Sequence, residues 1–275
     1  MFPLELSNDE VRKINDALDD GQHALVVHLA EGKRNDASSA REFRMFKARG
    51  FLRDGVSIIH GVALGQPEFA EMAKNGVGLI WSPHSNLELY CDTTDVRIAN
   101  QSQVKIALAP DWSPTGSDGV LEELNYAATW NAAQNLRVFT DAELVKMVTL
   151  NAAKLAKLDD KIGSLQPHHF ADLLVVHSQE TDPYRALVNA SPTDIRLVII
   201  GGSPVYGDDD LMQTLAPTAQ LEPVRVCGTM KVLDFDTEEE LQGKPPKSWK
   251  DTVDALTSAL KPWCLSPSDL TPCPP

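Results

Sequence analysis

The chain has 275 residues, of which 43% are hydrophobic and 23% charged, a composition typical of one large globular domain or of one domain with an appendage. Its formal net charge of -14 argues against nucleic acid and against an anionic membrane surface as partners, because both require concentrated positive charge. The sequence starts with neither a basic segment nor a long apolar run. It therefore predicts a cytoplasmic protein without a membrane span.

Strands and helices alternate along the first 111 residues. The hydrophobic periodicity predicts strands at 24–27, 56–59, 76–80 and 104–108, and helices at 8–20, 40–49, 67–74 and 95–102. This spacing is typical of strand and helix units in a parallel sheet.

Helices dominate the next part of the chain, and strands return after it. Helices are predicted at 121–131 and at 141–156, the second opened by a capping box of Thr140 and Glu143. Two strands follow at 171–176 and 195–200. From about residue 243 the sequence is rich in proline and lysine, and an irregular tail is predicted there.

Polar side chains occur where the predicted parallel strands end. His28, His60 and Asp111 follow three of them, and a loop with Asn86 follows the remaining one. Carboxyl ends of parallel strands meet at one edge, so these groups should share a cleft. Two imidazoles and a carboxylate suit a zinc-like cation, and Glu31 is near enough to His28 to move a proton. Taken singly, each residue has a structural alternative: Asp111 could be a helix N-cap, and a lone histidine is often only a hydrogen-bonded residue.

The four cysteines do not indicate a structural zinc site. Cys91 stands alone, Cys227, Cys264 and Cys273 lie towards the C-terminus, and no Cys-x-x-Cys pair occurs. Reduced thiols are expected, with a disulfide between Cys264 and Cys273 as the alternative.

Several motifs occur in the order and spacing of one known family. They are His28-Leu29-Ala30-Glu31-Gly32, Ile58-Ile59-His60-Gly61, Trp81-Ser82-Pro83-His84-Ser85-Asn86-Leu87, Ala107-Leu108-Ala109-Pro110-Asp111-Trp112-Ser113-Pro114, and Asn151-Ala152-Ala153 followed by Ile162-Gly163-Ser164-Leu165 and Ala171-Asp172-Leu173. From about residue 21 to 207 the chain resembles the C-terminal half of the amidohydrolase superfamily. The nearest branch contains s-triazine chlorohydrolases and aminohydrolases and guanine-type deaminases.

The resemblance implies an α/β fold in three parts. Residues 1–158 would form a partial (β/α) TIM barrel consisting of its last four strands. Residues 159–242 would contribute a small β-sandwich portion and the segment that follows it, and residues 243–275 would be the irregular proline-rich tail.

The resemblance also implies a role for each candidate residue. His28 would bind the metal from the fifth barrel strand, and Asp111, from the eighth, would bind the metal and accept a proton. Glu31 would carry a proton to the substrate, His60 would orient and polarise the attacking water, and Asn86 would lie in the substrate-side loop. The implied reaction is hydrolysis of a non-peptide C–N bond in a small molecule, with a nitrogen heterocycle as one option and a divalent metal, expected to be zinc, as cofactor.

The sequence also departs from the family. Family members usually have Gly-Thr where this chain has Ala109-Pro110, and Pro-Gly-Lys where it has Pro167-His168-His169. The His-x-His pair of the first barrel strand occurs nowhere in the 275 residues. Four strands cannot close an eight-stranded barrel, so the chain is expected to be the back half of a longer enzyme or to complete its sheet in another way.

Two functional hypotheses remain open. The first is a metal-dependent hydrolase, incomplete as it stands, that binds zinc weakly because two ligands are missing. The second is a non-catalytic half-barrel that acts as an oligomerisation or interaction module. Open sheet edges predict either a homo-oligomer or association with a missing N-terminal half. The joint presence of the four site residues favours the first hypothesis, and the missing His-x-His pair favours the second.

Overall fold

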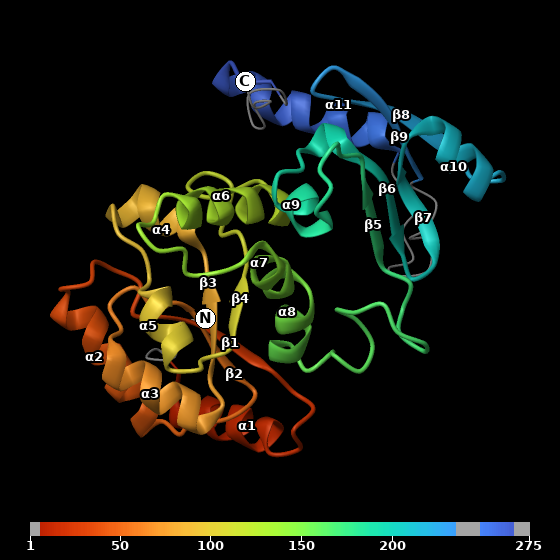
Figure 1. Ribbon diagram of the computed structural model, residues 1–275. Coiled ribbons are helices and arrows are strands. Elements are labelled where there is room, and N and C mark those ends of the chain that lie inside the picture. The colour runs from red at the N-terminus through yellow and green to blue at the C-terminus, as the bar shows by residue number, and fades with distance from the viewer. Residues whose placement is uncertain (1–5, 235–247, 267–275) are drawn as a thin grey trace. The chain divides into compact units, whose positions relative to one another are not determined.

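A computed structural model describes residues 6–234 and 248–266 of the chain. The chain divides into an N-terminal unit, Met1–His169, and a C-terminal unit, Phe170–Pro275. Each unit contains its own sheet (Figure 1). No helix among the described residues is long and apolar enough to cross a membrane. The domain limits drawn from the sequence, at residues 158 and 242, stay predictions.

The sheet of the N-terminal unit has four parallel strands in sequential order. They are β1 (Leu25–Leu29), β2 (Val56–His60), β3 (Gly78–Trp81) and β4 (Ile106–Leu108). Leu29 pairs with His60, and Trp81 with Leu108, so the carboxyl ends of all four strands lie along one edge. Every strand end lies within two residues of its predicted position. The prediction succeeds because these strands are short apolar runs, as parallel strands covered on both faces require.

Helices connect these strands and cover the sheet. They are α1 (Asn8–Leu18), α2 (Ala37–Ala48), α3 (Gln66–Asn75), α4 (Pro83–Tyr90), α5 (Val96–Gln101), α6 (Val120–Ala132), α7 (Asp141–Val148) and α8 (Leu150–Leu155). Figure 1 shows them around the strands, with α2 packed on β1 and α7 and α8 packed on β4. The capping box at Thr140 is confirmed, since its Oγ1 accepts from the Glu143 N–H at 3.2 Å and its N–H donates to Glu143 Oε2 at 2.8 Å.

Two features of this unit differ from the prediction. The segment 141–156 forms two helices instead of one, because Thr149 has a φ of -125° and a ψ of -100°, outside the helical region. The second difference is α4, which the sequence indicated only as a loop. Ser82 precedes this helix and Pro83 occupies its first turn, a position where the missing N–H of proline costs nothing.

The C-terminal unit contains a five-stranded antiparallel sheet in the order β5-β6-β7-β9-β8. The strands are β5 (Leu173–Val176), β6 (Ile195–Ile200), β7 (Ser203–Gly207), β8 (Leu221–Val226) and β9 (Thr229–Asp234), and the helices are α9 (Pro183–Val188), α10 (Asp209–Leu215) and α11 (Trp249–Leu260). A small core of Leu197, Met212 and Val232 joins this sheet to α10.

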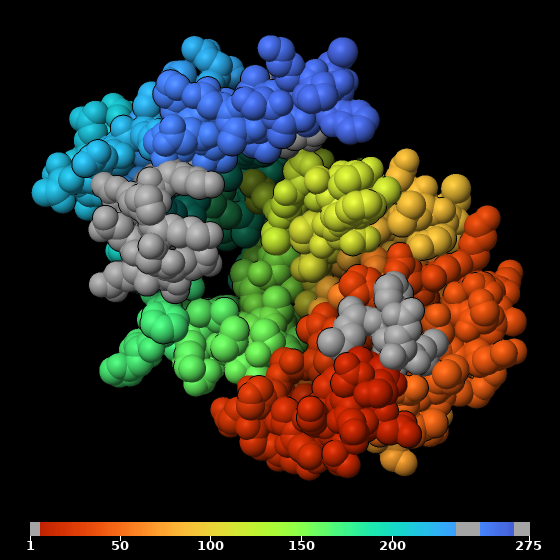
Figure 2. Space-filling view, turned by 180° about the vertical axis from the view of Figure 1, so that it is seen from behind, coloured from red at the N-terminus to blue at the C-terminus, as the bar shows by residue number. Residues whose placement is uncertain are grey.

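The prediction of an irregular tail is wrong for residues 249–260, which form α11. Ser248 caps this helix by accepting from the Asp251 N–H at 2.9 Å, and residues 249–260 themselves contain no proline. The Trp249 N–H donates to Glu222 Oε1 at 3.1 Å and so ties the start of the helix to β8. Figure 2 shows α11 in dark blue on the surface of this unit. A short 3-10 turn follows at Lys261–Trp263, and residues 243–247 and 267–275 of the predicted tail lie outside the described residues.

The cysteine prediction also needs correction. Cys91 and Cys264 are free thiols, whereas Cys227 is disulfide-bonded. The expectation of reduced thiols is therefore wrong for Cys227, and the alternative pairing of Cys264 with Cys273 is wrong because Cys264 is free. Cys273 itself lies outside the described residues.

Close approach of α8 to β3 at Gly78 provides a test of the packing of the N-terminal unit. A methyl group at Gly78 would collide with the Leu155 side chain and lie 2.7 Å from Ser57 Oγ. Gly78→Ala should therefore lower the free energy of unfolding by about 1–3 kcal/mol, measured by urea unfolding. The control is Gly119→Ser, since the helix start at Gly119 has open space and favours serine. Equal stability of the Gly78 variant and the wild type would contradict the prediction.

Candidate metal centre

Three side chains with metal-binding atoms meet at the carboxyl edge of the parallel sheet. His28 lies in β1, His60 ends β2, and Asp111 follows β4. One ligand atom from each lies within 4.8 Å of the other two. The rings of His28 and His60 have centroids 5.4 Å apart and planes tilted by 41°. The structure thus brings together three residues that the sequence places 32 and 51 positions apart.

The backbone at His60 is unusual for a residue with a side chain. Its φ is 67°, in the left-handed region, and Gly61 follows with a φ of 62°. A non-glycine residue there carries strain of about 1–3 kcal/mol, which the surrounding contacts must offset. The Gly61 N–H donates to Leu29 O at 3.1 Å, and the Thr94 hydroxyl donates to His60 O. These contacts hold the imidazole at the end of its strand.

Two carboxylates face the buried imidazole of His60. Its Nε2 lies 3.6 Å from Glu31 Oε2 and 3.8 Å from Asp111 Oδ2, and both acidic side chains are 22% exposed. Nε2 itself is buried and has no hydrogen-bond partner among the described residues. A buried nitrogen left unpaired beside carboxylates is costly, and a bound cation or water would satisfy it. The residues present therefore fit a divalent metal with nitrogen and oxygen ligands.

Helix α4 contacts three of the candidate residues. Ser85 Oγ donates to Asp111 Oδ2 at 2.7 Å, and Tyr90 OH donates to Glu31 Oε1 at 2.9 Å. Between them, Asn86 Oδ1 lies 2.9 Å from His60 Nδ1. Asn86 is thus on a helix with its side chain fully buried, which corrects its placement in a loop. Its contact with substrate stays a prediction.

The surroundings shift the pKa values of two groups at this site. Burial, followed by the nearby His60, lowers the pKa of His28, which favours the neutral imidazole that a metal requires. Burial and the hydrogen bond to Glu31 raise the pKa of Tyr90 to about 12, so its hydroxyl remains a donor at neutral pH.

The structure excludes the N-cap alternative for Asp111. Helix α6 starts at Val120 and its N-cap is Gly119, eight residues beyond Asp111. The Asp111 carboxylate instead accepts from Ser85 at the strand edge. The sequence did not identify Ser85 or Tyr90. The available signal was Ser82-Pro83, which is typical of a helix start and would have placed both residues on one helix.

A second polar cluster lies beside α4. Glu123 of α6 is fully buried, accepts from the Ser117 hydroxyl at 2.6 Å and accepts from the His84 N–H at 3.2 Å. The His84 ring stacks on Tyr126 with centroids 4.3 Å apart. Burial raises the pKa of Glu123 to about 7 although both hydrogen bonds oppose this shift.

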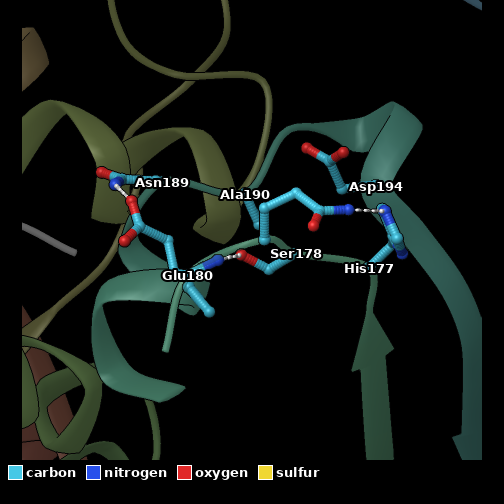
Figure 3. A pocket seen from close by; sticks show the side chains of 8 residues that line it. His177, Ser178, Glu180, Asn189, Ala190 and Asp194 are labelled. Carbon is cyan, nitrogen blue, oxygen red and sulfur yellow. Dashed lines mark hydrogen bonds between the residues drawn. The ribbon is translucent and has the colours of Figure 1, made fainter. Parts of the chain in front are cut away.

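Two cavities lie away from the candidate residues. One of about 500 Å³ in the C-terminal unit is lined by His177, Glu180, Asn189 and Asp194 among others, and Figure 3 shows Asn189 turned towards Glu180. Their amide and carboxylate are 3.2 Å apart, so they satisfy one another. The other, about 350 Å³, is lined by residues 91–97 and by Arg34 and Trp130 among others. None of the predicted site residues lines either cavity.

A four-stranded parallel sheet with this cluster at its carboxyl edge fits a partial (β/α) TIM barrel. Comparisons with known proteins agree with this class. The amidohydrolase family model matches residues 2–205, more than half of the sequence. The chain belongs to the amidohydrolase family, and its lineage is that of an enzyme.

The relatives are deaminases and hydrolases. A 5-methylthioadenosine/S-adenosylhomocysteine deaminase of Teredinibacter turnerae is 27% identical over 172 residues, 59% of this chain and 39% of the relative. An adenosine deaminase structure from Xanthomonas campestris with bound zinc has a TM-score of 0.65 at 22% identity, over 74% of this chain and 49% of its own. An atrazine chlorohydrolase from Arthrobacter aurescens complexed with zinc has a TM-score of 0.62 at 20% identity, over 72% and 47%. This chain therefore spans half or less of the length of these relatives.

The buried carboxyl of Glu123 should make the stability of the protein depend on pH. Because folding raises its pKa from 4.5 to about 7, the native state binds more protons than the unfolded chain between these pH values. The stabilising contribution is therefore complete below the unfolded pKa and is lost as the pH rises through about 7. Relative to Glu123→Gln, the wild type should lose about 2–3 kcal/mol of unfolding free energy between about pH 5 and about pH 8.

Urea unfolding of the wild type and of Glu123→Gln at both pH values measures this difference. Glu122→Gln is the matched control, because Glu122 is the exposed neighbour on the same helix and its charge contributes less than burial to the raised pKa of Glu123. The control should follow the wild type. An identical pH dependence in the wild type and in Glu123→Gln would show that the buried carboxyl does not have the raised pKa.

Proposed function

We propose that this chain carries the metal-binding and proton-transfer residues of a hydrolase that cleaves non-peptide C–N bonds in small molecules. The convergence of His28, His60 and Asp111 within 4.8 Å is the observation that carries the proposal. Family membership and relatives named as deaminases support it. A nitrogen heterocycle with an exocyclic amino group is the proposed substrate class, in line with the adenosine derivatives that name those relatives.

The proposed architecture is the second half of a TIM barrel. In this proposal β1 to β4 correspond to barrel strands five to eight, and the C-terminal sheet contributes to a β-sandwich. Matches that cover about half the length of larger relatives support a half-barrel. A barrel of this kind places its catalytic groups at the carboxyl ends of its strands, where His28, His60 and Asp111 lie.

The proposed cofactor is zinc, held by His28 and Asp111 with His60 within reach as a third ligand. When bound, a divalent metal supplies Lewis acidity that makes water a stronger acid and a nucleophile near neutral pH. Zinc in two solved relatives supports the choice of metal. Binding should be weak in this chain, because the described residues bring three ligands together where a stable zinc site usually has four.

The side chains around the centre are placed to move protons. Asp111 Oδ2 accepts from Ser85 and faces His60 Nε2, so this carboxylate can take a proton from the attacking water. Glu31 uses Oε1 to accept from Tyr90, which leaves Oε2 facing His60. In the proposed reaction Glu31 passes a proton to the leaving amine, while His60 orients the water.

A non-catalytic half-barrel is the second candidate function. The absence of a His-x-His pair from the sequence favours it, because that pair would complete the ligand set. Under this proposal the exposed sheet edges serve association, either between copies of the chain or with another half. Ammonia release tests for the hydrolase. Zinc-loaded chain that releases ammonia from adenosine, with loss in Glu31→Gln, supports a hydrolase that works without a second half. Zinc binding without any release fits the module, and it equally fits a hydrolase that needs its other half.

Zinc binding should depend on the strand-end residues. His28→Ala and Asp111→Ala each remove one of the three ligands that the described residues bring together, so either should weaken zinc binding by at least about tenfold. The measurement is competition with a coloured chelator, using metal-free protein. The wild type should lose its zinc readily to the chelator.

His168→Ala is the control for this experiment. His168 is exposed and belongs to the turn after the last helix of the N-terminal unit, so its loss should leave zinc affinity unchanged. Weaker binding in the His168 variant, with full binding in the His28 variant, would move the metal site away from the sheet edge. It would also remove the basis for the proposed reaction.

A further inference from the structure

The orientation of the Asn86 side-chain amide follows from its neighbour Thr94. The Thr94 hydroxyl has one proton and donates it to the backbone carbonyl of His60. Towards Asn86, 3.4 Å away, this hydroxyl can therefore only accept. The atom of Asn86 that faces Thr94 must be the donor nitrogen Nδ2.

Thr93 supports the same orientation. Its Oγ1 accepts from the indole N–H of Trp81 at 2.8 Å, and an indole nitrogen is a donor only. The same Oγ1 lies 3.3 Å from Asn86 Nδ2. The oxygen and nitrogen of an amide side chain are usually told apart only by their hydrogen bonds. Here the carbonyl of His60 makes the Thr94 hydroxyl a donor to it, and the contacts of Thr93 are compatible with the resulting orientation of Asn86. Asn86 Nδ2 therefore faces the two threonines, and Oδ1 faces His60.

This orientation of Asn86 determines which ring nitrogen of His60 carries the proton. Asn86 Oδ1 can only accept, and it lies 2.9 Å from Nδ1 of the imidazole, so Nδ1 carries a hydrogen. A neutral imidazole has a single N–H, and Nε2 is then left with its lone pair. Glu31 and Asp111 lie 3.6 Å and 3.8 Å from Nε2 and would otherwise attract the proton to that side. Asn86 thus keeps the proton on Nδ1, although both carboxylates favour it on Nε2.

We propose that Asn86 is a positioning residue that fixes the tautomer of His60, keeping Nδ1 protonated and presenting a bare Nε2 to the candidate metal centre. Its significance rests on the proposed function, because a protonated Nε2 could neither accept from a water molecule nor bind a metal. The tautomer itself is a property of this chain without metal or substrate. The fully buried side chains of His60 and Asn86 keep bulk water from competing for Nδ1.

Nitrogen-15 NMR of the metal-free chain tests this assignment directly. Spectra are recorded at about pH 8, where an ordinary histidine is neutral. His60→Gln identifies the His60 signals by their absence. In the wild type, Nδ1 should show an N–H shift and Nε2 the shift of a nitrogen with a lone pair. Asn86→Leu should move the proton, so that Nε2 takes the N–H shift.

Two further variants separate positioning from a general structural role. Asn86→Asp retains an acceptor for Nδ1 and should keep the wild-type tautomer. Asn131→Leu is the matched control, because Asn131 is also a buried helical asparagine with three hydrogen bonds, to Val138 and Phe139. It should lower stability and leave the His60 signals unchanged.

A protonated Nε2 in the wild type would overturn the proposal, and this result needs no variant that must fold. Retention of the Nδ1 proton in Asn86→Leu, or its loss in Asn131→Leu, would also overturn it. Because no metal or substrate is present, failure of zinc binding or of ammonia release would count against the proposed function and leave the tautomer assignment standing.

Discussion

The hydrogen bonds of α4 are the constraint on which the candidate centre depends. Parallel strands bring His28, His60 and Asp111 to one edge, but neighbouring strands are only about 4.8 Å apart and do not by themselves aim side chains at a common point. Hydrogen bonds from α4 orient the side chains around the centre: Ser85 contacts Asp111, Asn86 contacts His60, and Tyr90 contacts Glu31. At about 1.5 Å per residue, one short helix spans the whole group.

The same hydrogen bonds also stabilise the fold, so removing any of them should lower its stability. A hydrogen bond to a charged partner contributes about 1.5–3 kcal/mol, and a buried group left without its partner costs a similar amount. Glu123 supports α4 from α6. Its carboxyl group accepts hydrogen bonds from the backbone N–H of His84, at the start of α4, and from the Ser117 hydroxyl. The left-handed backbone of His60 persists because several contacts restrain it at once.

The sequence predicts the parallel strands and the residues at their ends for a clear physical reason. Fully buried strands are apolar runs, and carboxyl ends of parallel strands share an edge. It does not predict α4, because beyond Pro83 in the first turn the buried residues of this helix are the polar Ser85 and Asn86, which produce no hydrophobic periodicity. Nor does it distinguish Glu123 from the adjacent Glu122, since only the packing of α6 decides which carboxyl is buried. The hydrophobic pattern therefore locates the sheet but not the polar helix that orders the site.

The five-residue interval from Ser85 to Tyr90 has a consequence for how this protein can change through evolution. One inserted or deleted codon within it would rotate all following side chains by about 100° around the helix axis. Ser85 and Tyr90 could then no longer reach Asp111 and Glu31 together. Single substitutions alter one contact at a time and leave the others in place. Descendants of this chain can thus drift in amino-acid identity along α4 far more readily than in its length.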